Sequence, residues 1–195
     1  MNQKTKLIIL IVLLAAVLTG AFFAYRYFSK SFIPAQPTEQ KNETTAEADE
    51  TTEDNADKAA DFTVFDKDRK EIALSSRTGK PVVINFWATW CPPCRSELPA
   101  YQTLYDTYGE KVDFMMVALT DGYQETQSSV DAFIEENGYT FPVFYDLQGA
   151  AAEAYAVNSI PLSVFIDADG KVSHSQLGAM DEASLEGQIK TLLGE

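Results

Sequence analysis

The residues best suited to chemistry are the only two cysteines of the chain, Cys91 and Cys94. They stand three positions apart, with Pro92 and Pro93 between them and Trp90 directly before. Two thiols at this spacing can cycle between a dithiol and a disulfide, one attacking a substrate disulfide and the other resolving the mixed disulfide. A static disulfide or half of a zinc site is the alternative, but two cysteines and one histidine cannot supply four zinc ligands without a carboxylate. The spacing therefore favours redox chemistry.

The elements on either side of the cysteine pair must hold it in place. The apolar run PVVINFWA, residues 81–88, predicts a buried strand, and residues 94–108 predict a helix that ends at Gly109. Open α/β sheets place their sites at this carboxyl end of a strand. Cys91 is expected at the helix N-cap, with Pro92 at the first helical position. The free N–H groups there favour a thiolate at Cys91, whereas Cys94, one turn into the helix, is expected to be more buried.

The remaining pattern predicts strands that alternate with helices. Strands are expected at residues 62–65, 71–74, 112–119 and 141–145, and helices at 124–137, 150–156 and 181–193. Residues 162–168 and 171–176 predict a hairpin around the turn Asp169-Gly170. This order indicates an α/β fold with a mixed sheet.

The N-terminal third of the chain has a different composition. Leu7–Ala24 is an uncharged run of 18 residues, long enough to cross a bilayer, and predicts a membrane anchor over residues 1–30; a cleaved signal peptide is the alternative. Residues 31–60 are expected to form a disordered acidic linker, because Glu39–Asp61 holds nine acidic and two basic residues. Residues 61–195 then form one globular domain. The net charge of −14 argues against a nucleic-acid partner.

The motif Trp-Cys-Pro-Pro-Cys after VVINFWA resembles the active site of the thioredoxin superfamily. More narrowly, it is similar to the TlpA/ResA/CcmG group of membrane-anchored extracytoplasmic thiol–disulfide oxidoreductases. The segment NSIPLSVFIDADGK, residues 158–171, resembles the cis-proline segment and following hairpin of that group, and residues 124–145 its insertion. The resemblance implies a thioredoxin-like fold: a central mixed β-sheet flanked by helices, an extra N-terminal strand pair and a helix–strand insertion. It implies no cofactor and no metal.

The resemblance also gives roles to residues around the cysteine pair. Glu97, one helical turn after Cys94, matches a buried acid that in ResA-like members handles the proton of the resolving cysteine. A solvent-facing position is the default for a helix glutamate. Asn85 stands where plain thioredoxin has an acidic residue on the strand, so Glu97 or water must take the proton here. The residues expected to contact substrate flank the attacking cysteine and the cis-proline: Trp90, Pro92, Pro93, Ile160 and Pro161.

The implied function is a protein-disulfide reductase anchored in the cell membrane with its C-terminal domain on the extracytoplasmic side. Its substrates are apocytochrome c or another oxidised exported protein, and its partner is a membrane electron donor of the CcdA/DsbD kind. A disulfide-forming oxidant of the DsbA kind shares the motif and differs in reduction potential, which the sequence does not set. Two other classes fit less well: a Sco-type copper module has CxxxC spacing, and a thiol peroxidase has Thr or Ser where Ala88 stands.

Overall fold

A computed structural model describes residues 58–77 and 79–195. The predicted anchor, residues 1–30, and nearly all of the predicted linker, residues 31–60, lie outside the described residues. Within the described part, no helix combines the length and the apolar character needed to cross a membrane. Contacts of the domain extend to Lys58, which forms a β-bridge with Lys171, and the N–H of Ala59 donates to the carbonyl of Gly170. The domain's contacts therefore begin at Lys58, three residues before residue 61, the predicted start of the domain.

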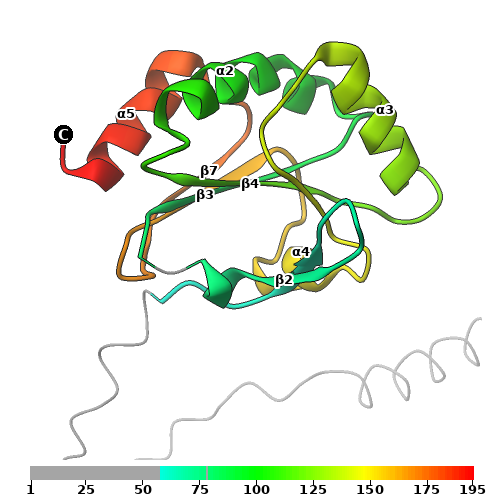
Figure 1. Ribbon diagram of the computed structural model, residues 1–195, viewed down its shortest axis with the longest axis horizontal. Helices are drawn as coiled ribbons and strands as arrows, with labels where there is room; N and C mark the ends of the chain where they lie inside the picture. The colour runs from blue at the N-terminus through cyan, green and yellow to red at the C-terminus, as the bar shows by residue number, and fades with distance from the viewer. Residues whose placement is uncertain (1–57, 78) are drawn as a thin grey trace, which may run out of the picture. The chain divides into compact units, whose positions relative to one another are not determined.

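Seven strands of the described residues form one mixed sheet in the order β2-β1-β5-β4-β3-β6-β7 (Figure 1). β3 pairs in parallel with β4 and antiparallel with β6, so it lies inside the sheet. The antiparallel pair β1–β2 continues the sheet beyond β5. The strands are β1 (Thr63–Phe65), β2 (Glu71–Ala73), β3 (Val82–Trp87), β4 (Asp113–Ala118), β5 (Val143–Tyr145), β6 (Leu162–Ile166) and β7 (Val172–Leu177).

Helices cover both faces of this sheet. In Figure 1, α2, α3 and α5 lie above the sheet, and α4 lies below it. The helices are α2 (Pro92–Tyr108), α3 (Gln127–Asn137), α4 (Ala150–Ala154) and α5 (Glu182–Leu193), with a short 3-10 turn at Leu74–Ser76.

The side chains of β3 alternate between two apolar clusters. Val83 and Trp87 belong to the cluster that includes residues of α2, α3 and α5, whereas Ile84 and Phe86 belong to the cluster that includes Ala151 of α4. All six residues of β3 are buried. A strand covered on both faces has a continuous apolar sequence, which explains the run at residues 81–88.

The predicted α/β class is confirmed, with the mixed sheet, the N-terminal strand pair and the helix–strand insertion formed by α3 and β5. Several predicted boundaries differ from the structure by two or more residues: β5 begins at Val143 and not at residue 141, α4 ends at Ala154 and not at residue 156, β6 ends at Ile166 and not at residue 168, and α3 begins at Gln127 and not at residue 124. The α3 difference is the largest. The backbone before Gln127 forms a turn and not a helix, because one carboxylate oxygen of Asp121 accepts the N–H groups of residues 123, 124 and 125. Thr126 then caps the helix, with reciprocal hydrogen bonds to Ser129.

Candidate active site

Cys91 and Cys94 form a disulfide directly after the carboxyl end of β3, with 2.05 Å between the sulfur atoms. Cys91 is the N-cap of α2, in extended conformation, and Pro92 is the first helical residue. The backbone N–H of Cys94 points at Cys91 Sγ, 3.3 Å away. The predicted N-cap geometry is confirmed. The N–H of Cys94, at the N-terminus of α2, can therefore stabilise a thiolate at Cys91.

A shallow groove of about 440 Å³ opens over Cys91. Trp90, 49% exposed, forms part of its wall. The carbonyl oxygen of Ile160 lies 3.8 Å from Cys91 Sγ, and the Ile160–Pro161 peptide bond is cis, as the resemblance implies. None of the lining residues is charged, so the groove suits an uncharged segment of a substrate. Its lining residues are Trp90, Cys91, Pro92, Pro93, Leu119, Val157, Asn158, Ser159 and Ile160.

Glu97 lies behind the disulfide, on α2, with 1% of its surface exposed. Its Oε1 accepts a hydrogen bond from Asn85 Nδ2 (2.8 Å), and its Oε2 accepts one from the N–H of Met180 (3.0 Å). Burial raises the pKa of the Glu97 carboxyl above its ordinary value, and the hydrogen bonds from Met180 and Asn85 only partly oppose this shift. A buried carboxyl one turn from a buried thiol can accept a proton from that thiol and return it.

Asn85 connects Glu97 to two buried hydroxyl groups. Besides its bond to Glu97, Asn85 Nδ2 lies 3.3 Å from both Tyr101 Oη and Ser163 Oγ, and these two oxygens are 2.7 Å apart. Burial, and then the charge of Glu97, raise the pKa of Tyr101, so its hydroxyl stays protonated. Asn85 Oδ1 is buried and has no hydrogen-bond partner. The amide can therefore present either a donor or an acceptor to Glu97, with the hydroxyl pair adjusting in response.

A second buried carboxylate, that of Glu125, contacts the backbone just before the motif. Its Oε2 accepts hydrogen bonds from the N–H of Thr89 (2.5 Å) and from Thr89 Oγ1 (2.8 Å), and its Oε1 accepts one from Ser129 Oγ (2.6 Å). Glu125 lies in the loop between β4 and α3, and it is fully buried. The sequence carries no signal for this contact, because Glu125 is far from the motif along the chain.

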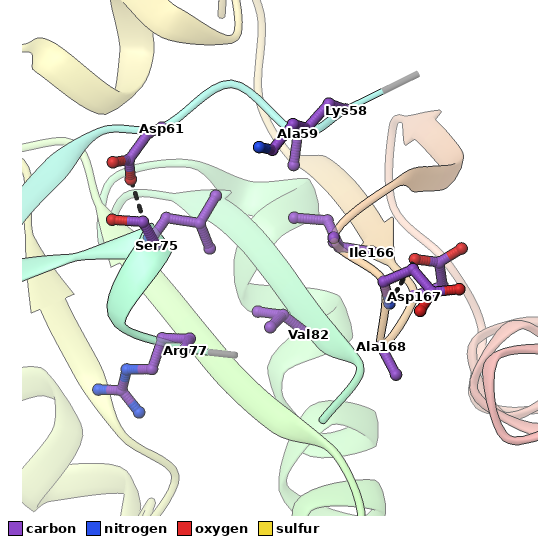
Figure 2. A pocket seen from close by; sticks show the side chains of 12 residues that line it. Lys58, Ala59, Asp61, Ser75, Arg77, Val82, Ile166, Asp167 and Ala168 are labelled. Carbon is purple, nitrogen blue, oxygen red and sulfur yellow. Dashed lines mark hydrogen bonds between the residues drawn. The ribbon is translucent and has the colours of Figure 1, made fainter. Parts of the chain in front are cut away.

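Another pocket, of about 360 Å³, lies at the opposite end of the sheet (Figure 2). It contains Val82, the first residue of β3, and Ile166, the last residue of the antiparallel β6. Figure 2 shows the carboxylate of Asp61 turned to Ser75, whose N–H donates to it at 2.8 Å. This pocket contains no cysteine, so the reactive groups belong to the groove over Cys91.

The structure brings the sequence-predicted residues together in one site. Cys91 faces the groove, while Cys94 and Glu97 lie behind it, and their chemical roles stay predictions. The sequence did not identify four groove residues, Leu119, Val157, Asn158 and Ser159, nor the buried partners Tyr101, Ser163, Met180 and Glu125. Within residues 58–77 and 79–195, no cluster of three His, Cys, Asp or Glu side chains is placed to hold a metal ion.

Comparison with known proteins places the chain in a family. Residues 56–175 match the profile of the AhpC/TSA family, over more than half of the chain. The chain belongs to the AhpC/TSA family. Within that family, the relatives that it resembles are named for disulfide chemistry. It is 40% identical, over 126 residues, to the thiol–disulfide oxidoreductase ResA of Oceanobacillus iheyensis. That match covers 64% of each protein, slightly less than two thirds of the relative's length.

A longer match extends over nearly the whole chain. The ResA of Bacillus cereus is 34% identical over 193 residues, which are 97% of this chain and 98% of that relative. Among solved structures, StoA from Bacillus subtilis superposes with a TM-score of 0.59 at 30% identity, covering 67% of this chain and 97% of StoA. The exposed lipoprotein thioredoxin of Streptococcus pneumoniae gives 0.59 at 29% identity, covering 70% of this chain and 100% of that chain. The AhpC/TSA chain described here is a thiol–disulfide oxidoreductase of this ResA and StoA type.

Proposed function

We propose that the chain is a reductant that delivers electrons to disulfides of exported proteins. The observation that carries this proposal is the buried Glu97 carboxyl, one turn after Cys94 and bonded to Asn85 and Met180. A buried acid at this position can take the proton of Cys94 at the step in which Cys94 must become a nucleophile. Its negative charge also disfavours a second charge on the dithiol, and a reduced form that is less stabilised is a stronger reductant.

The reaction proceeds by two sulfur exchanges. The Cys91 thiolate attacks one sulfur of the substrate disulfide, so a Cys91–substrate bond forms and the substrate S–S bond breaks; the departing sulfur takes up a proton. Cys94 then gives its proton to Glu97 and attacks Cys91 Sγ. The Cys91–Cys94 disulfide forms, and the second substrate sulfur leaves as a thiolate that takes up a proton from solvent, while Glu97 releases the proton it took from Cys94. Two electrons have then passed to the substrate. The uncharged groove over Cys91, with the Ile160 backbone at its edge, would receive the substrate segment.

The proposed setting is the extracytoplasmic side of the cell membrane. The uncharged run at residues 7–24 supports a membrane anchor, and the acidic stretch that follows supports a tether between anchor and domain. Relatives named ResA support a role of the cytochrome c maturation or exoprotein repair type, with apocytochrome c or another oxidised exoprotein as substrate. Continued turnover then requires a membrane donor of the CcdA/DsbD kind that reduces the Cys91–Cys94 disulfide.

The redox state of the cysteine pair in living cells tests this proposal. Cells that express the full chain are quenched with acid, and free thiols are then alkylated with a reagent that adds a measurable mass. A reductant supplied by a membrane donor is held mainly as the dithiol, so most of the chain should gain two labels. A chain found mainly as the disulfide, with no label, would assign it to disulfide formation instead.

A further inference from the structure

Glu125 is a buried acid that takes no part in the two sulfur exchanges. It is fully buried, yet its side chain is bonded to neutral donors: the N–H and hydroxyl of Thr89 and the hydroxyl of Ser129. A buried carboxylate is costly unless hydrogen bonds compensate it, so these bonds hold Thr89 firmly in place. Thr89 is followed directly by Trp90 and Cys91.

The loop that carries Glu125, residues 119–126, is itself fixed by hydrogen bonds. Asp121 Oδ1 accepts the N–H groups of residues 123, 124 and 125, and the Glu125 carbonyl accepts those of Asp121 and Gly122. Gly122 has φ +73°, a conformation that favours glycine. The same loop supplies Leu119 to the groove wall, together with the motif residues. One rigid loop therefore both lines the groove and holds the segment in front of Cys91.

We propose that Glu125 is a positioning residue for substrate recognition. Through Thr89 it fixes Trp90, the half-exposed wall of the groove, so that a protein segment meets a preformed surface next to Cys91. Glu125 thereby makes the insertion between β4 and β5 part of the recognition site. The role rests on the proposed function, because it concerns the binding of protein disulfides.

The positioning role predicts different effects on two reactions of the Cys91 thiolate. A small neutral disulfide such as 2,2′-dithiodipyridine needs only the Cys91 thiolate, whereas a folded protein disulfide must also fit the groove. Loss of the Glu125 carboxylate should therefore impair the second reaction and spare the first. Misplacement of a binding group by about 1 Å can cost on the order of a hundredfold, and a loosened Trp90 should cost about tenfold in KM.

The experiment uses the full-length chain in detergent solution and compares Glu125→Ala and Thr89→Val with the wild type. The second variant replaces the Thr89 hydroxyl with a methyl group of similar size, so it removes the side-chain hydrogen bonds to Glu125 and keeps the backbone one. It keeps the assay informative if Glu125→Ala does not fold. The matched control is Asp146→Asn, which alters another buried carboxylate. Asp146 accepts the N–H groups of Ala151 and Ala152 at the start of α4, on the other face of the sheet.

Each protein is assayed for insulin reduction and for the rate with 2,2′-dithiodipyridine. We expect Glu125→Ala to raise KM for insulin about tenfold and Thr89→Val to raise it severalfold, with dithiodipyridine rates within about twofold of wild type. The control should leave both readouts unchanged. Equal losses in both reactions, or no loss in either, would overturn the positioning role. A wild type that cannot reduce insulin contradicts the proposed function alone, and KM is then measured for the oxidation of reduced, unfolded ribonuclease.

Discussion

Replacing Glu97 with glutamine should remove the proton acceptor and leave the fold nearly intact. The new side chain can still accept the N–H of Met180 through its carbonyl oxygen, while its amide nitrogen faces Asn85, whose unpartnered Oδ1 can turn to accept it. The free energy of unfolding should therefore stay within about 1 kcal/mol of wild type. Glu97→Ala, in contrast, leaves the Asn85 and Met180 donors buried without this acceptor. At about 1–3 kcal/mol each, this should cost about 2–6 kcal/mol.

The kinetic effect of Glu97→Gln should be large and dependent on pH. General acid–base catalysis contributes about 100- to 10,000-fold, so resolution of the mixed disulfide by Cys94 should slow at least about a hundredfold at about pH 7. The deficit should shrink as pH rises, because the Cys94 thiol then ionises increasingly without help from Glu97. Stopped-flow measurement of thiol release from a preformed mixed disulfide checks this across pH. Parallel pH profiles for variant and wild type would refute the role of Glu97 as proton acceptor.

The raised pKa of Glu97 also predicts how stability depends on pH. In the native state the carboxyl keeps its proton above its ordinary pKa of 4.5, so between that value and its native pKa the folded chain binds more protons than the unfolded chain. The free energy of unfolding of the wild type should therefore fall, relative to that of Glu97→Gln, as pH rises through this window. Urea denaturation of both proteins at several pH values measures the difference. A difference that does not change with pH would contradict the raised pKa.

Three further predictions concern other parts of the site. Cys94→Ser keeps the attacking cysteine and should trap mixed disulfides that survive non-reducing gels; a variant that turns over like wild type would rule out resolution by Cys94. Tyr101→Phe leaves Ser163 without its closest partner and should cost about 1–3 kcal/mol in urea denaturation, whereas an unchanged midpoint would dismiss that bond. Backbone hydrogen bonds, chiefly from residue 125, lower the pKa of Asp121, so its stabilisation is full above its ordinary pKa of 3.8 and is lost as pH falls through its native value. The stability deficit of Asp121→Asn should therefore vanish in acid, and a constant deficit would contradict this.

The sequence predicted the elements whose signals are local. The run at residues 81–88 marked β3 because a strand buried on both faces needs apolar residues throughout. The turn Asp169-Gly170 marked the β6–β7 hairpin. The helix predicted from residue 181 begins at Glu182, with Asp181 as its N-cap. Cys91 and Pro92 likewise indicated where α2 begins.

Contacts across the fold could not be predicted in this way. The start of α3 depends on how Asp121 folds back on its own loop, and nothing in the periodicity of the helix shows that. The burial of Glu97 came from the family resemblance, since a helix glutamate is exposed by default. Glu125 was missed entirely, because its partner Thr89 belongs to a different loop and is brought to it only by the pairing of β3 with β4.

The reduction potential of the Cys91–Cys94 couple decides whether the chain is a reductant. The full-length chain is equilibrated with dithiol buffers of defined potential, and the fraction of disulfide is read by alkylation. A reductant should show a potential of about −230 mV or lower, in the range of thioredoxin-like reductants. A value of about −120 to −180 mV, the range of disulfide-forming oxidants and isomerases, would contradict the reductant role.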